Sequence, residues 1–324
     1  MLAAVIKKFG GPEVIEVLSN VPIPIIESAK QVLVRVGASG VNPVDTYIRN
    51  GQYAALPTLP YIPGRDGAGI VEQIGEDVQD VRVGDRVYFA TTVTGSAAEY
   101  CVAEKVFPLP PELSLQEGAC LGVPYMTAHR ALFILGNVQE GQRVLVHGAS
   151  GGVGIAAVQM AAGHDITVVG TAGTDEGMTL VRENGASDVY NHRKNGYLDE
   201  MKKKYSEGFD LIVEMAAHVN LMSDLDLLAK NGKVAVVGSR GEVKINPRAL
   251  MSRESSVFGV GLAHSTDADW FEASSFIFKH FSTTRYRPVI GRVYPLSSIS
   301  DAHRDVMSGE GARGKLLLSI NSNL

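Results

Sequence analysis

The chain has 324 residues, which is long enough for two domains with separate hydrophobic cores. Its hydrophobic content of 45%, charged content of 20% and net charge of -5 describe an ordinary globular protein, without the basic excess of nucleic-acid-binding proteins. No apolar stretch approaches the roughly 18 residues of a membrane span and no signal peptide is visible, so we expect a cytoplasmic protein without a membrane partner. Two cysteines, Cys101 and Cys120, are too few for a disulfide framework or a four-cysteine zinc site.

Residues 1–121 are predicted to form a compact, irregular β domain. Short β-rich runs alternate there with glycine and proline, which interrupt regular structure. The expected strands are 3–7, 31–36, 69–74, 86–90 and 98–102. A short helix is predicted over 43–49, because Asn42 can cap it, Pro43 suits its first position and Asn50-Gly51 is a stop signal.

A glycine-rich turn follows a connecting helix expected over 117–135. Residues 143–146 form a β-branched-rich run, four glycines fall in the next eight residues, and residues 155–161 have helix-forming composition. A strand, a glycine turn and a helix in this order predict a phosphate-binding cradle, because the free N–H groups of the first helical turn favour negative charge. The spacing is that of GxGxxG with Ala149 in the first place.

Further strands and helices alternate after this turn. The expected strands are 166–172, 187–191, 209–216, 233–239 and 256–261, and the expected helices are 175–184, 197–205 and 219–229. Repeated units of this kind predict an α/β fold with a doubly wound parallel sheet, whose ligand binds at the carboxyl ends of the strands.

The last part of the chain is predicted to return to the β domain. An amphipathic helix around 270–280, a strand at 288–291, a helix near 299–307 and a final strand over 315–320 follow the parallel sheet. We expect this carboxyl-terminal part to fold back onto the first domain.

Five ordered segments resemble those of a known family. They are Gly10-Gly11-Pro12-Glu13, the runs Gly40 to Arg49 and Leu145 to Gly154, Gly170 to Thr174, and Val237 to Gly241. With them the chain resembles the zinc-independent medium-chain dehydrogenase/reductases, and among these the zeta-crystallin-type NADPH:quinone oxidoreductases, nearly end to end. The resemblance implies a GroES-like catalytic domain, residues 1–121 completed by 262–324, and a Rossmann dinucleotide-binding domain, residues 122–261.

The resemblance also implies a set of cofactor contacts and a homodimer or homotetramer. The implied cofactor-binding residues are Tyr47, Ser150, Gly151, Gly152, Val153, Gly173, His192, Asn220, Val237, Gly238, Ser239, Arg240, Val260, Gly261 and Leu262. His192, with Arg193, is expected near the 2′-phosphate of NADPH. The residues themselves favour NADPH over NADH, because no acidic side chain that could hold ribose hydroxyls occurs at the end of the second strand before Asp175.

A catalytic metal is not expected. Zinc-dependent relatives carry Gly-His-Glu and a preceding cysteine, whereas the corresponding stretches here read Pro63-Gly64-Arg65-Asp66-Gly67 and Ser39-Gly40-Val41-Asn42. Without the imidazole and the thiolate, a zinc ion would lack the ligands that it prefers.

These features predict electron or hydride transfer from the nicotinamide to an apolar, planar quinone. Without a Lewis acid a simple carbonyl is a difficult substrate, whereas a quinone delocalises the developing charge. The resemblance places Tyr47 and Tyr53 near the nicotinamide as hydrogen-bond donors, with Asn42 shaping the site and Arg65 as a further candidate.

Two other functions stay open at this point. A zinc-independent enoyl or alkenal reductase would use a tyrosine at the Tyr53 position as its proton donor, so the same residues serve both activities. Relatives also include lens structural proteins and proteins that bind AU-rich RNA, but the basic run Lys202-Lys203-Lys204 is more typical of a solvated helix face. Subunits are expected to associate through the hydrophobic strand 257–260.

Overall fold

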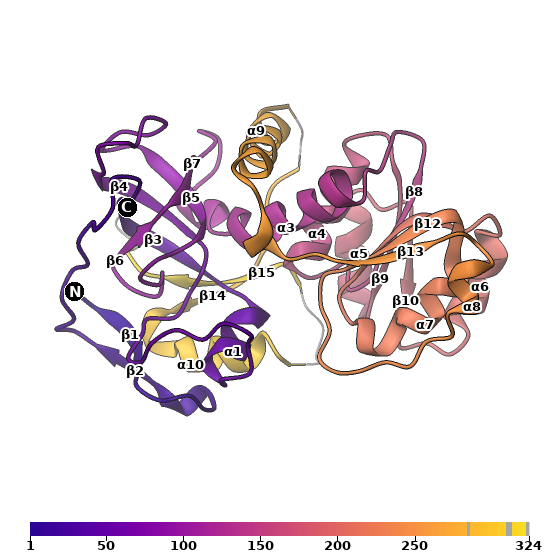
Figure 1. The fold of residues 1–324 in the computed structure, drawn as a ribbon, viewed down its shortest axis with the longest axis horizontal. Helices are drawn as coiled ribbons and strands as arrows, with labels where there is room; N and C mark the ends of the chain where they lie inside the picture. Colours follow the sequence, from indigo (N-terminus) through magenta and orange to yellow (C-terminus); the bar gives the residue numbers. More distant parts are fainter. Residues whose placement is uncertain (284–285, 309–312, 322–323) are drawn as a thin grey trace. The chain divides into compact units, whose positions relative to one another are not determined.

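The structure is a computed structural model that describes residues 1–283, 286–308, 313–321 and 324. The chain divides into two compact units, one with residues 1–123 and most of the chain from residue 281 onward, the other with residues 124–280 (Figure 1). Helix α9 (Asp267–Thr283) lies mainly in the second unit, whereas the sequence placed residues 262–324 with the first. An ion pair of 2.6 Å between Arg130 and Asp269 holds the start of this helix to the second unit.

The first unit is built on a seven-stranded sheet. Its strands follow the order β14-β15-β3-β4-β5-β7, and β6 also pairs with β3. Their bounds are β3 Val32–Val41, β4 Gly67–Ile74, β5 Arg86–Thr91, β6 Tyr100–Ala103, β7 Lys105–Pro108, β14 Ile290–Pro295 and β15 Lys315–Ser319, and a separate hairpin joins β1 Ala3–Ile6 to β2 Ile15–Leu18. Strand β15 pairs antiparallel with β3, so the end of the chain folds back onto the first part, as the sequence predicts.

The first unit also contains short helices. They are α1 Pro43–Arg49, α2 Leu115–Gly118 and α10 Ile299–Asp305, with 3-10 turns η1 Pro12–Val14 and η5 Leu296–Ser298. Helix α1 has the predicted bounds, and a capping box between Asn42 and Asp45 fixes its start. Strands β2 and β7 have no counterpart among the strands expected from the sequence.

The connecting helix expected over 117–135 is interrupted. After α2 the chain forms the π-helical segments η2 Leu121–Tyr125 and η3 Arg130–Leu135, separated by α3 Met126–His129. Pro124 lies inside η2 and has no N–H to donate to a preceding carbonyl, which accounts for the break in the α-helical pattern.

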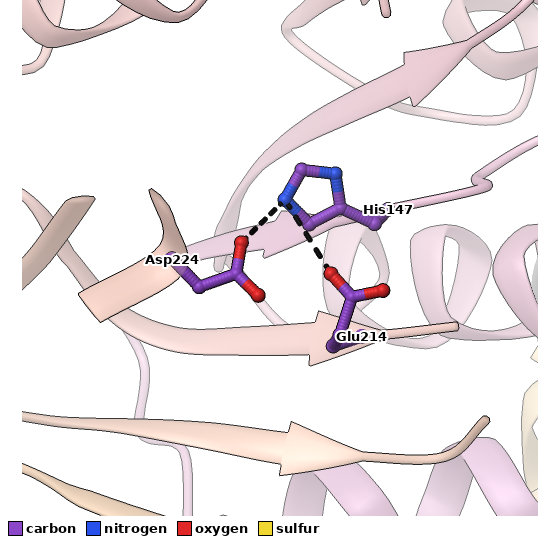
Figure 2. Close-up of side chains that lie close together, drawn as sticks. All are labelled: His147, Glu214 and Asp224. Carbon is purple, nitrogen blue, oxygen red and sulfur yellow. Dashed lines mark ion pairs between the residues drawn. The ribbon is translucent and has the colours of Figure 1, made fainter. Parts of the chain in front are cut away.

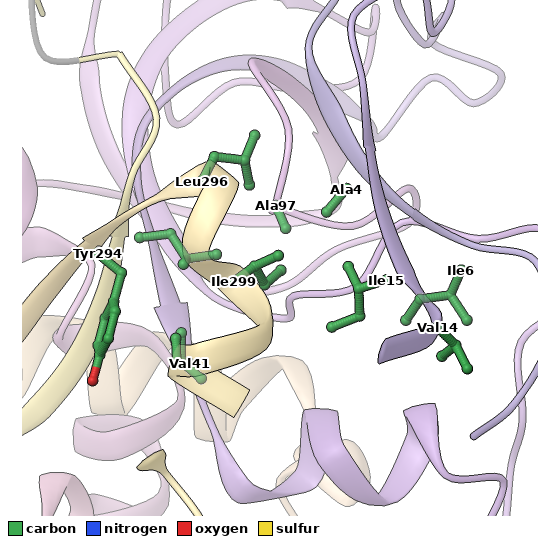
Figure 3. Close-up of a cluster of buried hydrophobic side chains, with 11 residues drawn as sticks. Ala4, Ile6, Val14, Ile15, Val41, Ala97, Tyr294, Leu296 and Ile299 are labelled. Atoms are coloured by element: carbon green, nitrogen blue, oxygen red, sulfur yellow. The ribbon is translucent and has the colours of Figure 1, made fainter. Parts of the chain in front are cut away.

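A hydrophobic cluster in the first unit joins the two ends of the chain (Figure 3). Its members are buried side chains from the N-terminal hairpin, β3, the loop between β5 and β6, and the C-terminal elements: Ala4, Ile6, Val14, Ile15, Val41, Ala97, Tyr294, Leu296, Ile299, Ala302 and Leu318. Each large apolar side chain that leaves water stabilises the fold by roughly 1.5–3 kcal/mol. The N-terminal hairpin, α10 and β15 therefore stabilise one another.

The second unit contains a six-stranded parallel sheet in the order β10-β9-β8-β11-β12-β13. The strands are β8 Arg143–Val146, β9 Thr167–Ala172, β10 Asp188–Asn191, β11 Phe209–Glu214, β12 Leu228–Val236 and β13 Ser256–Gly259. The order runs outward from β8 in both directions, as in dinucleotide-binding folds. The prediction of a doubly wound parallel sheet in one unit and a β-rich fold in the other is confirmed.

Five helices of the second unit connect these parallel strands: α4 Gly152–Ala162, α5 Asp175–Glu183, α6 Tyr197–Lys204, α7 Ala217–Leu227 and α8 Arg248–Met251. Helix α3 precedes the first of these strands, and the 3-10 turn η4 Leu262–His264 and helix α9 follow the last. None of the described helices has both the length and the apolar character that crossing a membrane requires. The helices α4 to α7 lie close to the positions that the sequence predicts.

Candidate functional site

The cofactor-binding residues predicted in the second unit gather at one edge of its sheet. All six strands run parallel, so their carboxyl ends share that edge. Residues 150–153 follow β8, Gly173 follows β9, His192 follows β10, Asn220 lies on α7 after β11, residues 237–240 follow β12 and residues 260–262 follow β13. Tyr47 belongs to the first unit.

The turn after β8 has the backbone geometry of a phosphate cradle. Gly148 has a φ of +59°, a left-handed conformation that favours glycine. The N–H of Gly151 donates to the carbonyl of Gly148 at 3.1 Å, and the N–H of Ala149 donates to the carbonyl of Thr171 at 2.8 Å. A Cβ at Gly154 would lie 2.4 Å from the Gly148 oxygen, so only glycine lets helix α4 approach the turn this closely.

Helix α4 presents free amide groups at this turn. Its N-cap is Gly151, which has no side chain that could cap the helix. The N–H of Ile155 donates to the carbonyl of Gly151 at 2.8 Å, which is the first bond of the helical ladder. The N–H groups of residues 152–154 therefore have no acceptor within the helix, and with the helix dipole they attract a phosphate or pyrophosphate.

Basic side chains lie at the end of β9. A Cβ at Gly173 would lie 2.9 Å from Nε2 of His192 and 2.9 Å from Nε of Arg193, so both side chains approach this glycine. The nearest following acid, Asp175, is already in the first turn of α5. This edge suits an additional phosphate better than it suits a pair of ribose hydroxyls.

Hydrogen bonds tie the loops after β11 and β12 together. The carbonyl of Glu214 accepts from the N–H groups of Val237 at 2.8 Å and Gly238 at 3.2 Å, and the carbonyl of Gly238 accepts from the N–H of Ala217 at 2.9 Å. Asn220 Nδ2 donates to both carboxylate oxygens of Glu214, at 3.3 and 3.2 Å. Asn220, Val237 and Gly238 are thus held in one hydrogen-bonded group.

The remaining predicted contacts lie around this group. Ser239 and Arg240 are exposed, and Ser239 Oγ donates to the carbonyl of Gly241 at 2.9 Å. Val260 continues the pairing of β13 with β12, because its N–H donates to the carbonyl of Val236 at 2.9 Å. Residues 260–262 are half-buried.

Three buried titratable side chains lie at the same edge of the sheet, and we call them the His147 cluster: His147, Glu214 and Asp224 (Figure 2). His147 Nε2 lies 3.0 Å from Asp224 Oδ1 and 3.8 Å from Glu214 Oε2. Burial opposes the charged imidazolium, but the Asp224 and Glu214 carboxylates outweigh it and raise the pKa of His147. Burial is the main cause that raises the pKa of Glu214 to about 7; the positive charge of His147 opposes this rise, and the Asp224 charge adds to it.

The first unit holds a second buried ionic group, the Lys315 cluster: Asn42, Asp45, Asp66 and Lys315. Lys315 Nζ lies 3.2 Å from Asp66 Oδ2 and also donates to Asn42 Oδ1. Asn42 Nδ2 donates to Asp66 Oδ1 at 2.7 Å, so both ends of this amide are engaged. Burial and then the Asp66 charge raise the pKa of Asp45 to about 6, while Lys315 opposes the rise.

The predicted catalytic tyrosines belong to the first unit. Tyr47 is half-buried on α1, and Tyr53 is 41% exposed in the loop that follows Gly51. Arg65 is half-buried immediately before Asp66. The contacts of these three side chains with a substrate or a nicotinamide stay a prediction from the resemblance.

His147, Glu214, Asp224 and Lys315 are not among the functional residues predicted from the sequence. Each stands within or at the end of a mostly apolar segment, where a charged side chain is seldom buried without a partner. That signal identifies the residues but not their partners, because Lys315 and Asp66 lie far apart along the chain.

Comparisons with known proteins agree with this geometry. Residues 28–111 match the alcohol dehydrogenase GroES-like domain, and residues 152–279 match the zinc-binding dehydrogenase family. A quinone oxidoreductase from Homo sapiens is 46% identical over 323 residues, which cover 99% of this chain and 98% of that protein.

Solved structures show the same architecture. A mycobacterial protein in complex with NADPH superposes with a TM-score of 0.89 at 27% identity, covering 98% of this chain and 99% of the other. A quinone oxidoreductase from Thermus thermophilus, solved also with NADPH, has a TM-score of 0.85 at 31% identity and covers 99% of this chain and 100% of the other. This chain belongs to the quinone oxidoreductases of the medium-chain dehydrogenase/reductase family.

Proposed function

We propose that this chain reduces quinones with NADPH. The observation that carries the proposal is the edge of the parallel sheet, where the uncapped start of α4 meets a turn that only glycine allows at Gly154. The similarity to a human quinone oxidoreductase over almost the whole chain supports the same activity. When bound, NADPH supplies the hydride or the electrons, and the protein supplies its orientation.

NADPH is proposed rather than NADH because of the residues around Gly173. Arg193 provides positive charge for a 2′-phosphate, His192 places a ring nitrogen beside it, and no carboxylate lies between the end of β9 and Asp175 to repel that phosphate. The KM values for NADPH and NADH test this choice. We expect the lower KM for NADPH, and a lower KM for NADH would contradict the proposal.

The residues of the first unit support a reaction without a metal. Arg65 and Asp66 stand where zinc-dependent relatives have a histidine and a glutamate, and the Lys315 ammonium lies 3.2 Å from Asp66. A cation already paired with this carboxylate opposes a second cation there. We propose Tyr47 and Tyr53 as hydrogen-bond donors to the reduced oxygen, while Asn42, held by Asp66 and Lys315, fixes the start of α1.

The substrate class is tested by comparing ortho-quinones with 2-alkenals and enoyl thioesters, with NADPH oxidation as the readout. The proposal expects kcat/KM for quinones to exceed that for the other two classes. Preferred turnover of alkenals or enoyl thioesters would instead make the chain a zinc-independent enoyl or alkenal reductase.

We also propose self-association through β13. This strand is at the edge of its sheet, and Ser256 and Gly259 are exposed there. Light scattering should find a dimer or a tetramer, and a monomer alone would contradict the proposal. The proposed location is the cytoplasm.

RNA binding has little support from the charges of α6. Lys204 pairs with Asp188 at 2.6 Å, and Lys202 lies 3.5 Å from Asp226. Two of the three lysines in the basic run are therefore already partly neutralised. RNA binding that persists at physiological salt and is displaced by NADPH would reverse this conclusion.

A further inference from the structure

The His147 cluster has no place in the cofactor contacts proposed above. His147 is 2% exposed, and Glu214 and Asp224 are fully buried. Burial of ionic groups rarely adds net stability compared with apolar side chains of similar volume, although removing one partner is costly. We therefore infer that the cluster has a role other than packing. Its contacts indicate that this role is to connect loops at the edge of the sheet.

On one side, the cluster contacts the turn after β8. His147 Nδ1 lies 3.2 Å from Thr171 Oγ1, and this hydroxyl also accepts from the N–H of Gly148 at 3.2 Å. Nε2 lies 3.0 Å from Asp224 Oδ1 as an ion pair without the alignment of a hydrogen bond, so Asp224 attracts the charged ring while Nδ1 faces the Thr171 hydroxyl. The Thr171 hydroxyl thus links the charged ring to the first residue of the phosphate-binding turn.

On the other side, the cluster contacts the loop after β11. One carboxylate oxygen of Glu214 accepts from the N–H of Ala216, and both accept from Asn220 Nδ2. The Glu214 carbonyl accepts from Val237 and Gly238. His147 and Glu214 therefore connect the turn after β8 with the loops after β11 and β12.

We propose that His147 is a positioning residue for the nucleotide: its ring, paired with Asp224 and Glu214, holds the turn at Gly148 and the loop at Asn220 in the arrangement that receives NADPH. This inference rests on the proposed function, because it names residues that support the same site. His147 itself touches neither substrate nor cofactor in this proposal.

The charges around the ring come from four elements. Asp224 lies on α7, Glu214 at the end of β11, His192 after β10 and Tyr197 on α6. Burial, and then the positive charge of His147, lower the pKa of His192. Burial, and then the charges of Asp224 and Glu214, raise the pKa of Tyr197. Among the titratable groups described here, only the two carboxylates offset the positive charge of His147.

The test compares H147Q with the wild-type chain and with H164Q, which replaces an exposed histidine of the same unit. Dissociation constants and KM values for NADPH are measured below the unfolding temperature of every variant. Loss of a hydrogen bond to a charged group predicts an increase of about 10- to 100-fold in both constants for H147Q, with kcat at saturating NADPH changed less than about threefold. H164Q should match the wild type.

A second variant covers the case in which H147Q does not fold. T171V removes the hydroxyl between the ring and Gly148 while keeping the ion pairs, and about a tenfold rise in the dissociation constant is expected. Unchanged NADPH affinity in T171V or in a folded H147Q overturns the inference. Failure of the wild type to bind NADPH overturns the proposed function instead.

Metal analysis separates the proposal from a competing use of the same atoms. The ligand atoms of His147, Glu214 and Asp224 lie within 4.8 Å of one another, a spacing that a divalent ion could occupy. The proposal expects no stoichiometric metal in the purified protein and unchanged NADPH affinity after chelation. A bound metal whose removal weakens NADPH binding would overturn it, because the carboxylates would then be ligands rather than partners of the imidazolium.

Discussion

Each unit of the molecule contains a buried cluster in which a basic side chain faces one or two carboxylates, and the two basic groups differ in kind. In the first unit Lys315 faces Asp66, and in the second His147 faces Asp224 and Glu214. Lysine is the more permanent cation, whereas imidazole is the side chain that ordinarily titrates nearest neutral pH. Similar buried arrangements can therefore give a fixed support for α1 in one unit and an adjustable support for the nucleotide loops in the other.

The largest expected effect comes from removing the permanent cation. K315M leaves Asp66 buried without its cation, and breaking a buried ion pair in this way costs about 3–5 kcal/mol of unfolding free energy. Denaturant titration measures the loss. The matched control is K7M, which removes an exposed ion pair between Lys7 and Glu16. Loss of this exposed pair should change the unfolding free energy by less than about 1 kcal/mol. Equal effects of the two substitutions would show that the Lys315 cluster is not a structural support.

A substitution at Gly154 alters the turn beside His147 without changing a charge. In G154A the new Cβ would lie 2.4 Å from the Gly148 oxygen, so the turn or the helix must shift, at a cost of about 1–3 kcal/mol. The NADPH dissociation constant should rise by at least about tenfold, which corresponds to about 1.4 kcal/mol.

G259A is the control for G154A, because a Cβ at Gly259 meets no atom within 4 Å. Its NADPH affinity should equal that of the wild type. If G154A binds NADPH as tightly as G259A does, the turn after β8 is not the phosphate site.

The pH dependence of stability tests the buried Glu214 carboxyl of the His147 cluster. The pKa of Glu214 is raised from 4.5 to about 7, mainly by burial, so this carboxyl binds its proton more tightly in the folded state. It contributes stability that is fully present below pH 4.5 and is lost as the pH rises through about 7. E214Q removes this dependence. Between pH 5 and pH 8 the unfolding free energy should therefore fall by roughly 1–3 kcal/mol less in E214Q than in the wild type.

Glu207 supplies the control for this series, because its side chain is exposed. Unfolding free energies from denaturant titrations at several pH values should fall in parallel for E207Q and the wild type. If E214Q also follows the wild type, Glu214 does not titrate differently in the folded and unfolded states.

The smallest expected effect lies outside both clusters. Asp165 has a φ of +54°, which costs a residue with a Cβ about 1–2 kcal/mol. D165G relieves this cost but increases the entropy of the unfolded chain, so a net stabilisation below about 1 kcal/mol is expected. Thermal unfolding should show a slightly higher Tm for D165G and a lower Tm for D165A. A lower Tm for D165G would mean that the aspartate side chain stabilises this turn.

The sequence predicts the second unit better than the first. Apolar strands that alternate with helices determine a parallel sheet, and residues that follow such strands must meet at one edge, as residues 150–153 and Gly173 do. The irregular strands β2 and β7 carry no comparable periodicity. The interruption at Pro124 depends on a local choice between α- and π-helical turns that composition does not fix.

The buried clusters show why part of the site could not be predicted. A sequence position such as Lys315 reveals an unusual charge in an apolar strand, but its partner Asp66 becomes its neighbour only through the pairing of β15 with β3 and of β3 with β4. His147 and Asp224 meet in a similar way, because one follows β8 and the other lies on α7. Such contacts between distant segments are set by topology rather than by local pattern.

The most direct test of the central claim is an NADPH titration of the wild-type chain with amide hydrogen exchange followed residue by residue. We expect saturable binding together with slower exchange of the amides of residues 148–154, where the turn after β8 meets the start of α4. The absence of saturable binding, or protection confined to other segments, would contradict it.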